Sequence, residues 1–140
     1  MRKAGVVLGL LATVGIWAYA QSAPVVYKAT LAGNSEVPPV NTQARGAAQV
    51  NADSATNQAS WRVEYSGVSG PLTGAHIHCG APAGANAGVA VNFGTTLASP
   101  ITGSGSMTPA QMADLQAGRC YVNLHTDANK GGEIRGQLAP

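Results

Sequence analysis

The three histidines of the chain are concentrated in two short segments, at positions 76 and 78 and at position 125. Both segments have the composition of β-strands, in which side chains alternate between the two faces. His76 and His78 therefore share one face of the first strand. In the second, His125 shares a face with Asn123 and Tyr121. If the two strands are neighbours in a sheet, three imidazoles converge at one place.

Three converging imidazoles predict a transition-metal site, since imidazole suits Cu(II), Zn(II) and Ni(II). Three protein ligands with one open position are typical of a reactive or exchangeable site. We favour copper, with zinc second, because nitrogen sites bind Cu(II) more tightly. Only neutral imidazoles bind metal, so affinity should fall as the pH drops through about 6.5.

The hairpin that follows the second segment supplies further candidates. A symmetric seven-residue loop over residues 126–132 places Glu133 opposite His125 and Arg135 opposite Asn123. Glu133 is then predicted to be a fourth ligand or the acceptor that orients the ring. Arg135 would bring a positive charge near the open position, while Asn123 and Tyr121 complete the same face.

A structural role for the histidines is the alternative. Paired histidines on a sheet can bond to loop carbonyls and to Glu133 without holding any metal. A mixed site with Cys79 is disfavoured because strand alternation turns that sulfur to the opposite face. Glu36, in a Pro-flanked loop, is expected to bond backbone amides or Arg45.

The two cysteines, Cys79 and Cys120, lie on the apolar faces of the same two segments. They should be close in space if the histidines converge. A disulfide between them is predicted for a chain in an oxidising compartment. Two separate buried thiols are the alternative.

Residues 1–20 have the pattern of a targeting segment. Arg2 and Lys3 are followed by an apolar run and by the small-x-small sequence at 18–20. The mature chain is expected to start near Gln21 and to be periplasmic or extracellular. No later segment has the roughly 20 apolar residues of a membrane span.

Charge argues against nucleic acid as a partner. The chain has 8 Lys+Arg and 6 Asp+Glu, and Arg2 and Lys3 belong to the targeting segment, so the remainder is balanced. It has no basic stripe of the kind that phosphate binding needs.

The rest of the chain predicts an all-β domain over residues 24–140. Short alternating or apolar runs separated by Gly- and Pro-rich turns predict strands at 25–31, 46–52, 60–65, 72–79, 88–93, 102–107, 120–126 and 133–138. Thr108, Pro109 and Gln111 form a helix start, and Gly118 can end that helix. This pattern favours an antiparallel Greek-key β-sandwich or barrel, immunoglobulin-like or superoxide-dismutase-like, with one short helix.

Four motifs, at residues 33–40, 74–78, 121–126 and 131–138, resemble the CHRD domain. The resemblance covers roughly residues 25–138 and implies an extracellular or periplasmic β-sandwich domain. Bacterial members of that family mostly lack an assigned biochemical role. The two cysteines are not part of the pattern. A more distant likeness to copper/zinc superoxide dismutase is confined to His76, His78 and His125, which are too few for that enzyme's copper and zinc ligands.

Three functional hypotheses follow. The first is an exported protein that binds a transition metal, copper favoured, in metal handling or redox protection. The second is a non-catalytic adhesion or interaction domain whose partner is another exported or cell-surface protein. The third is a superoxide-dismutase-like copper enzyme in which Arg135 guides the anion; it is disfavoured by the small ligand set and the lack of a proton-relay set.

Overall fold

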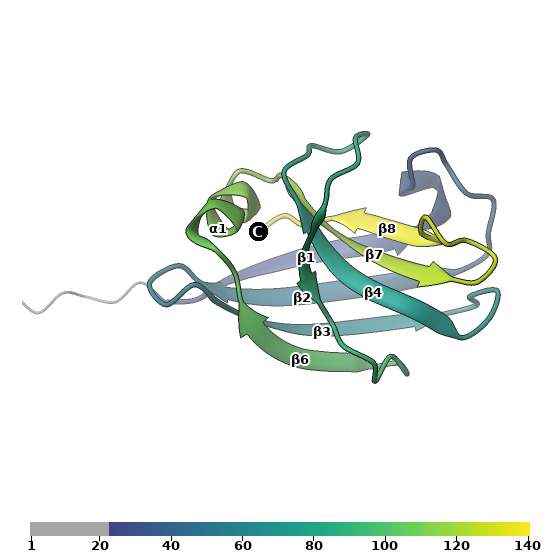
Figure 1. The fold of residues 1–140 in the computed structure, drawn as a ribbon, viewed down its shortest axis with the longest axis horizontal. Coiled ribbons are helices and arrows are strands. Elements are labelled where there is room, and N and C mark those ends of the chain that lie inside the picture. The colour runs from purple at the N-terminus through teal and green to yellow at the C-terminus, as the bar shows by residue number, and fades with distance from the viewer. Residues whose placement is uncertain (1–22) are drawn as a thin grey trace, which may run out of the picture.

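The computed structural model describes residues 23–140 and shows one curved antiparallel sheet with a short helix beside it (Figure 1). The strands are β1 (Val25–Ala32), β2 (Arg45–Asp53), β3 (Gln58–Ser66), β4 (Leu72–Cys79), β5 (Val89–Asn92), β6 (Ile101–Ser106), β7 (Cys120–Thr126) and β8 (Ile134–Gln137). The helices are the 3-10 turn η1 (Gly33–Ser35) and α1 (Pro109–Gln116). The predicted targeting segment, residues 1–20, lies outside the described residues.

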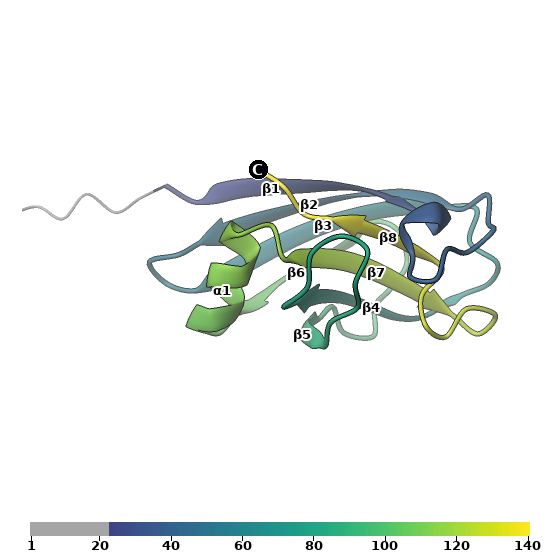
Figure 2. The same cartoon turned by 90° about the horizontal axis from the view of Figure 1, so that it is seen from above.

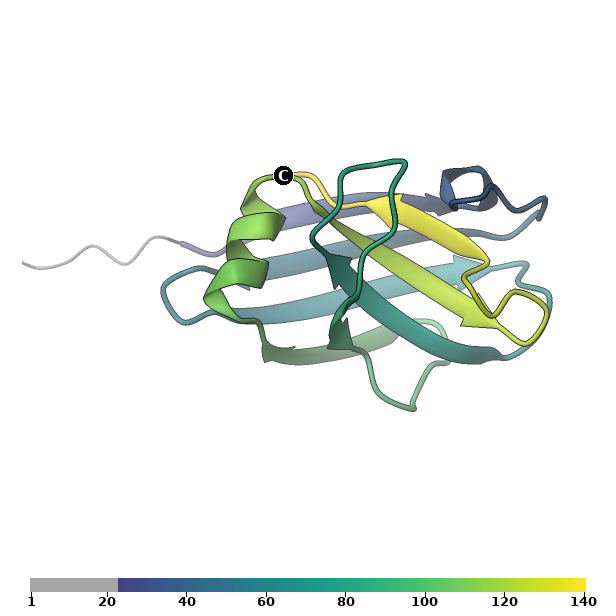
Figure 3. The same cartoon turned by 45° about the horizontal axis from the view of Figure 1, so that its top comes forward.

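The strands pair in the order β5-β4-β7-β8-β1-β2-β3-β6, and each neighbouring pair is antiparallel. The sheet curls into a nearly closed barrel, and Figures 2 and 3 show α1 lying across one end of it. The predicted all-β antiparallel fold with one short helix is therefore confirmed.

Alternation along the strands builds the core. In β3, Trp61 and Val63 are buried, while Arg62 and Glu64 face solvent and form an ion pair with each other. The Trp61 ring stacks on Phe93 with 4.7 Å between ring centroids. Because Phe93 directly follows the end strand β5, and β3 is the neighbour of the other end strand, β6, this contact connects the two sides of the curled sheet.

Gly103 makes room for the Trp61 ring from β6. A Cβ at Gly103 would lie 2.7 Å from Trp61 Cζ2, whereas a Cβ at Gly105 would lie 3.5 Å from the same ring. We expect Gly103→Ala to lower the free energy of unfolding by about 1–3 kcal/mol through overpacking. Gly105→Ala, the matched control in the same strand, should cost less than half as much in urea denaturation. Equal effects of the two changes would contradict this account of the contact.

The helix α1 begins as its sequence predicts. Thr108 Oγ1 accepts a hydrogen bond from the Gln111 backbone nitrogen, and Gln111 Oε1 accepts one from the Thr108 nitrogen. This capping box satisfies two backbone groups at the helix start. Met112 and Leu115 are buried against the sheet. Among residues 23–140, no helix has the length and apolar character needed to cross a membrane.

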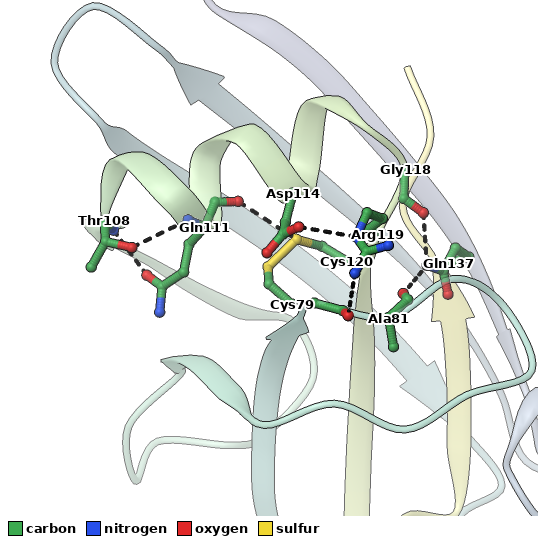
Figure 4. A network of polar contacts seen from close by, with 10 residues as sticks. Cys79, Ala81, Thr108, Gln111, Asp114, Gly118, Arg119, Cys120 and Gln137 are labelled. Carbon is green, nitrogen blue, oxygen red and sulfur yellow. Dashed lines mark hydrogen bonds and ion pairs between the residues drawn. A yellow bond between two sulfur atoms is a disulfide. The ribbon is translucent and has the colours of Figure 1, made fainter.

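Cys79 and Cys120 form a disulfide, as predicted, between directly opposed positions of β4 and β7 (Figure 4). Their Cα atoms are 4.1 Å apart. Polar contacts surround this end of the two strands: Arg119 donates to the Gly80 carbonyl and pairs with Asp114. The disulfide therefore joins the two strands that carry the histidines.

Candidate metal centre

The pairing of β4 with β7 brings the three histidines to one face of the sheet. His76 is opposite Asn123, and His125 is opposite Gly74. Ala75 and Ile77 alternate with the β4 histidines and are fully buried in the core, which turns the imidazoles to the other face.

The predicted convergence of the imidazoles is confirmed. Ring centroids lie 5.6 Å apart for His76 and His78, 5.0 Å for His76 and His125, and 6.0 Å for His78 and His125. One ring nitrogen from each residue lies within 4.8 Å of the other two. The three side chains could therefore share one metal ion.

Backbone carbonyls fix the orientation of two of the rings. His78 Nδ1 bonds the Ala87 carbonyl at 2.8 Å, and His125 Nδ1 bonds the Lys130 carbonyl at 3.0 Å. A carbonyl can only accept, so each Nδ1 carries the proton, and each Nε2 has a free lone pair when the ring is neutral. Nε2 of His78 is buried and has no hydrogen-bond partner among the described residues. Both rings thus present a metal-binding nitrogen, oriented as in known metal sites.

His76 supplies the third ring of the cluster. His76 Nδ1 lies 3.2 Å from His125 Nε2. Two nitrogens on one metal, each with a bond of about 2.0–2.1 Å, are separated by roughly 2.9–3.3 Å. The same distance suits a hydrogen bond donated by His76. The pair can therefore share either a proton or a metal ion.

The environment keeps two of the rings neutral. Burial, together with the neighbouring His125 and His78, lowers the pKa of His76 from 6.5 to about 4. Burial is also the main cause that lowers the pKa of His78. The rings of His76 and His78 therefore each have a nitrogen lone pair available to a metal at neutral pH. Protons compete with the metal for these lone pairs only at a lower pH than for an unperturbed histidine.

Gly74 lies beside the rings of His76 and His125. A Cβ there would be 3.0 Å from His76 Cε1 and 3.7 Å from His125 Cδ2. We expect Gly74→Ala to displace the His76 ring and weaken metal binding roughly tenfold, an effect typical of changes next to ligands. Gly70→Ala is the matched control, because a Cβ there would meet nothing within 4 Å. Calorimetric titration of both variants checks this, and equal affinities would show that Gly74 does not shape the site.

Glu133 differs from its predicted role beside His125. Its buried carboxylate accepts hydrogen bonds from the hydroxyls of Thr42, Ser69 and Thr126 and from the Ser69 backbone nitrogen. Hydrogen bonds from Ser69, Thr126 and Thr42 outweigh burial and lower the pKa of this carboxyl. The regular β7–β8 pairing stops at Leu124 and Ile134, and the side-chain partners of the Glu133 carboxylate are Thr42, Ser69 and Thr126 rather than His125. The acceptor that orients His125 is the Lys130 carbonyl instead.

Tyr121 and Arg135 support the site from behind His78. The Tyr121 ring stacks parallel to His78 at 4.9 Å, and the Arg135 guanidinium carbon lies 3.4 Å from the Tyr121 centroid. The terminal nitrogens of Arg135 donate to the Ala85 carbonyl and to Asn86 Oδ1. Its charge contributes to lowering the pKa of His78, but its hydrogen-bonding groups are engaged by the 80–88 loop rather than offered to an anion at the cluster.

A buried polar layer covers this face of the sheet, and the sequence pattern does not reveal it. Tyr121, Asn123 and Arg135 are each at most 3% exposed. The loop at 80–88 lies over them: Ala87 contacts the Tyr121 hydroxyl. Glu36 joins the layer by accepting from Asn123, whereas Arg45, one of its two expected kinds of partner beside backbone amides, donates to the carbonyls of Thr42 and Ala44.

A comparison with protein families matches residues 27–138 to the CHRD domain. The chain belongs to the CHRD domain family. The match covers all eight strands apart from the first residues of β1, and all three histidines of the cluster lie inside it. The cysteine pair of this CHRD domain lies within the same range. No curated protein and no solved structure matches the chain.

Proposed function

We propose that this CHRD-domain protein is exported and binds one divalent transition metal through His76, His78 and His125. Copper is the favoured ion, and metal handling or redox protection is the role. The observation that carries the proposal is the set of three ring nitrogens within 4.8 Å of one another. Two of those rings are oriented by backbone carbonyls, and the buried Nε2 of His78 lacks a partner among the described residues.

The ligand chemistry supports copper before zinc. The cluster offers nitrogen donors, and the nearby sulfurs are tied up in the Cys79–Cys120 disulfide. For an all-nitrogen site, Cu(II) has a higher intrinsic affinity than Zn(II). Three protein ligands leave a coordination position for water or an exchanging partner ligand, which suits handling of the ion.

Export is supported by two independent features. Disulfides persist in oxidising compartments, and the Cys79–Cys120 bond is consistent with one. The sequence of residues 1–20 has the targeting pattern described above. A periplasmic or extracellular location would also bring the protein into contact with metal ions from the environment.

An interaction domain with structural histidines is the second candidate. The His78 and His125 bonds to loop carbonyls hold the 80–88 and 127–132 loops against the sheet with or without metal. An enzyme of the superoxide-dismutase type gains no support from Arg135, whose terminal nitrogens are engaged by the 80–88 loop.

Elemental analysis of the protein purified from an exported, oxidised preparation tests the proposal. We expect close to one equivalent of copper in the protein as purified and none in His76→Ala prepared in parallel. Equal metal content in both proteins, or none in either after incubation with Cu(II) and desalting, would favour the interaction domain.

A further inference from the structure

Glu36 is a buried carboxyl that the metal site does not use. It follows η1 and is 4% exposed, in a segment that folds back on itself through a Val40-to-Gly33 backbone hydrogen bond. Its side chain reaches the middle of β7, where Asn123 Nδ2 donates to Oε2 at 3.4 Å. Glu36 thereby joins the 33–42 segment to the sheet.

The other oxygens of these two groups lie close to the same backbone position, Gly132. Glu36 Oε1 and Asn123 Oδ1 are both buried, and neither has a partner among the described residues. Both lie within 2.6 Å of the point that a Cβ of Gly132 would occupy, so they approach the same small space. Two acceptors in that arrangement repel each other, and leaving both unsatisfied is costly. A single proton on Oε1 removes the repulsion and satisfies both atoms.

We propose that Glu36 is held as a neutral carboxylic acid that pairs with the Asn123 carboxamide through two hydrogen bonds, forming a pH-sensitive latch. In the protonated state, Oε1–H donates to Asn123 Oδ1 while Asn123 Nδ2 donates to Oε2. Loss of the proton breaks the first bond and leaves a buried negative charge. The 33–42 segment is then held less firmly on the β7–β8 hairpin.

The charges around Glu36 fit this assignment. Burial raises the pKa of Glu36 from 4.5 to about 7, and the opposing effect of Arg135 from β8 is smaller. Neither the 80–88 loop nor the rest of the 33–42 segment has an ionisable side chain. Glu133, on the same hairpin, is engaged by Ser69, Thr42 and Thr126. Glu36 and Arg135 also line a cavity of about 430 Å³, which gives water a route to the ionised form.

The sign of the stability effect follows from the raised pKa. The neutral carboxyl stabilises the folded state fully below pH 4.5, and this stabilisation is lost as the pH rises to about 7. Over that interval the folding equilibrium constant should fall about tenfold per pH unit, or roughly two orders of magnitude in total. Above pH 7 no further loss arises from this group.

Glu36→Gln provides the test, because the glutamine amide can donate to Asn123 Oδ1 and accept from Nδ2 at every pH. Urea denaturation of the metal-free mature protein from pH 4.5 to 8.5 should show the variant gaining stability relative to wild type up to about pH 7. Glu64→Gln, at an exposed position paired with Arg62, should follow the wild-type profile. Subtracting the Glu36→Gln profile removes the contribution of the three histidines, which both proteins share.

A direct titration keeps the proposal falsifiable if Glu36→Gln folds poorly. The carboxyl carbon of Glu36 in ¹³C-labelled wild-type protein should titrate with a midpoint near pH 7. A midpoint at or below 4.5 would overturn the latch. Parallel pH profiles for wild type and Glu36→Gln would overturn it as well.

Discussion

His76→Ala and His125→Ala are each expected to weaken Cu(II) binding by at least about a hundredfold. Each change removes one of three ring nitrogens that lie within 4.8 Å of one another. The remaining two imidazoles cannot close the site, and the loss of a ligand should exceed the 10- to 100-fold cost of losing an outer-shell partner. Calorimetric titration of metal-free protein at pH 7 measures this directly.

The control for this experiment lies on another part of the barrel. Gln49→Ala changes an exposed residue of β2 and should bind copper like the wild type. The double variant of His76 and His125 should show no specific binding. Unchanged affinity in the double variant would show that the histidine cluster does not bind the copper. The interaction domain would then be the better explanation.

Removal of the disulfide should have the largest effect on stability. The Cys79–Cys120 bond spans 41 residues, and chain-entropy arguments give about 3–4 kcal/mol for a loop of that size. We expect Cys79→Ser combined with Cys120→Ser to lower the free energy of unfolding by this amount. Urea denaturation of the double variant and of wild type, with and without reductant, measures it.

The comparison with reductant separates two causes. If the covalent bond is responsible, reduced wild type should unfold at nearly the same urea concentration as the double variant. A double variant as stable as oxidised wild type would contradict the expected contribution of the bond. Metal binding should change far less than stability, because the sulfurs and the imidazoles lie on opposite faces of their strands.

Local patterns in the sequence predict much of the fold. The alternation of Trp61 and Val63 with charged residues places β3, and the capping residues Thr108 and Gln111 place the start of α1. The symmetric turn sets the register of the last hairpin, in which Asn123 is indeed opposite Arg135. These features depend on residues close together in the chain, so their physical cause is visible in the sequence.

The surroundings of the site depend on contacts that no local pattern encodes. Glu133 bonds Thr42 and Ser69, which are 91 and 64 positions away in the chain. The burial of Arg135 results from the 80–88 loop, whose small residues give no periodic signal. The sequence thus indicates which side chains share a face, but it does not reveal which loops cover that face.

The sequence also does not predict which backbone carbonyls bond the histidines. Ala87 and Lys130 act through their backbone oxygens, so their side chains give no hint of the role. Lys130 lies in the loop between β7 and β8, directly after Asn129, whose backbone bonds that of Thr126.

Electron paramagnetic resonance of the protein loaded with one equivalent of Cu(II) tests the central claim most directly. Three bound imidazoles predict a single copper species with splitting from three equivalent or nearly equivalent nitrogens, reduced to two nitrogens or lost in His125→Ala. A spectrum of free or heterogeneous copper in the wild type, or an identical spectrum in His125→Ala, would contradict a site made by His76, His78 and His125.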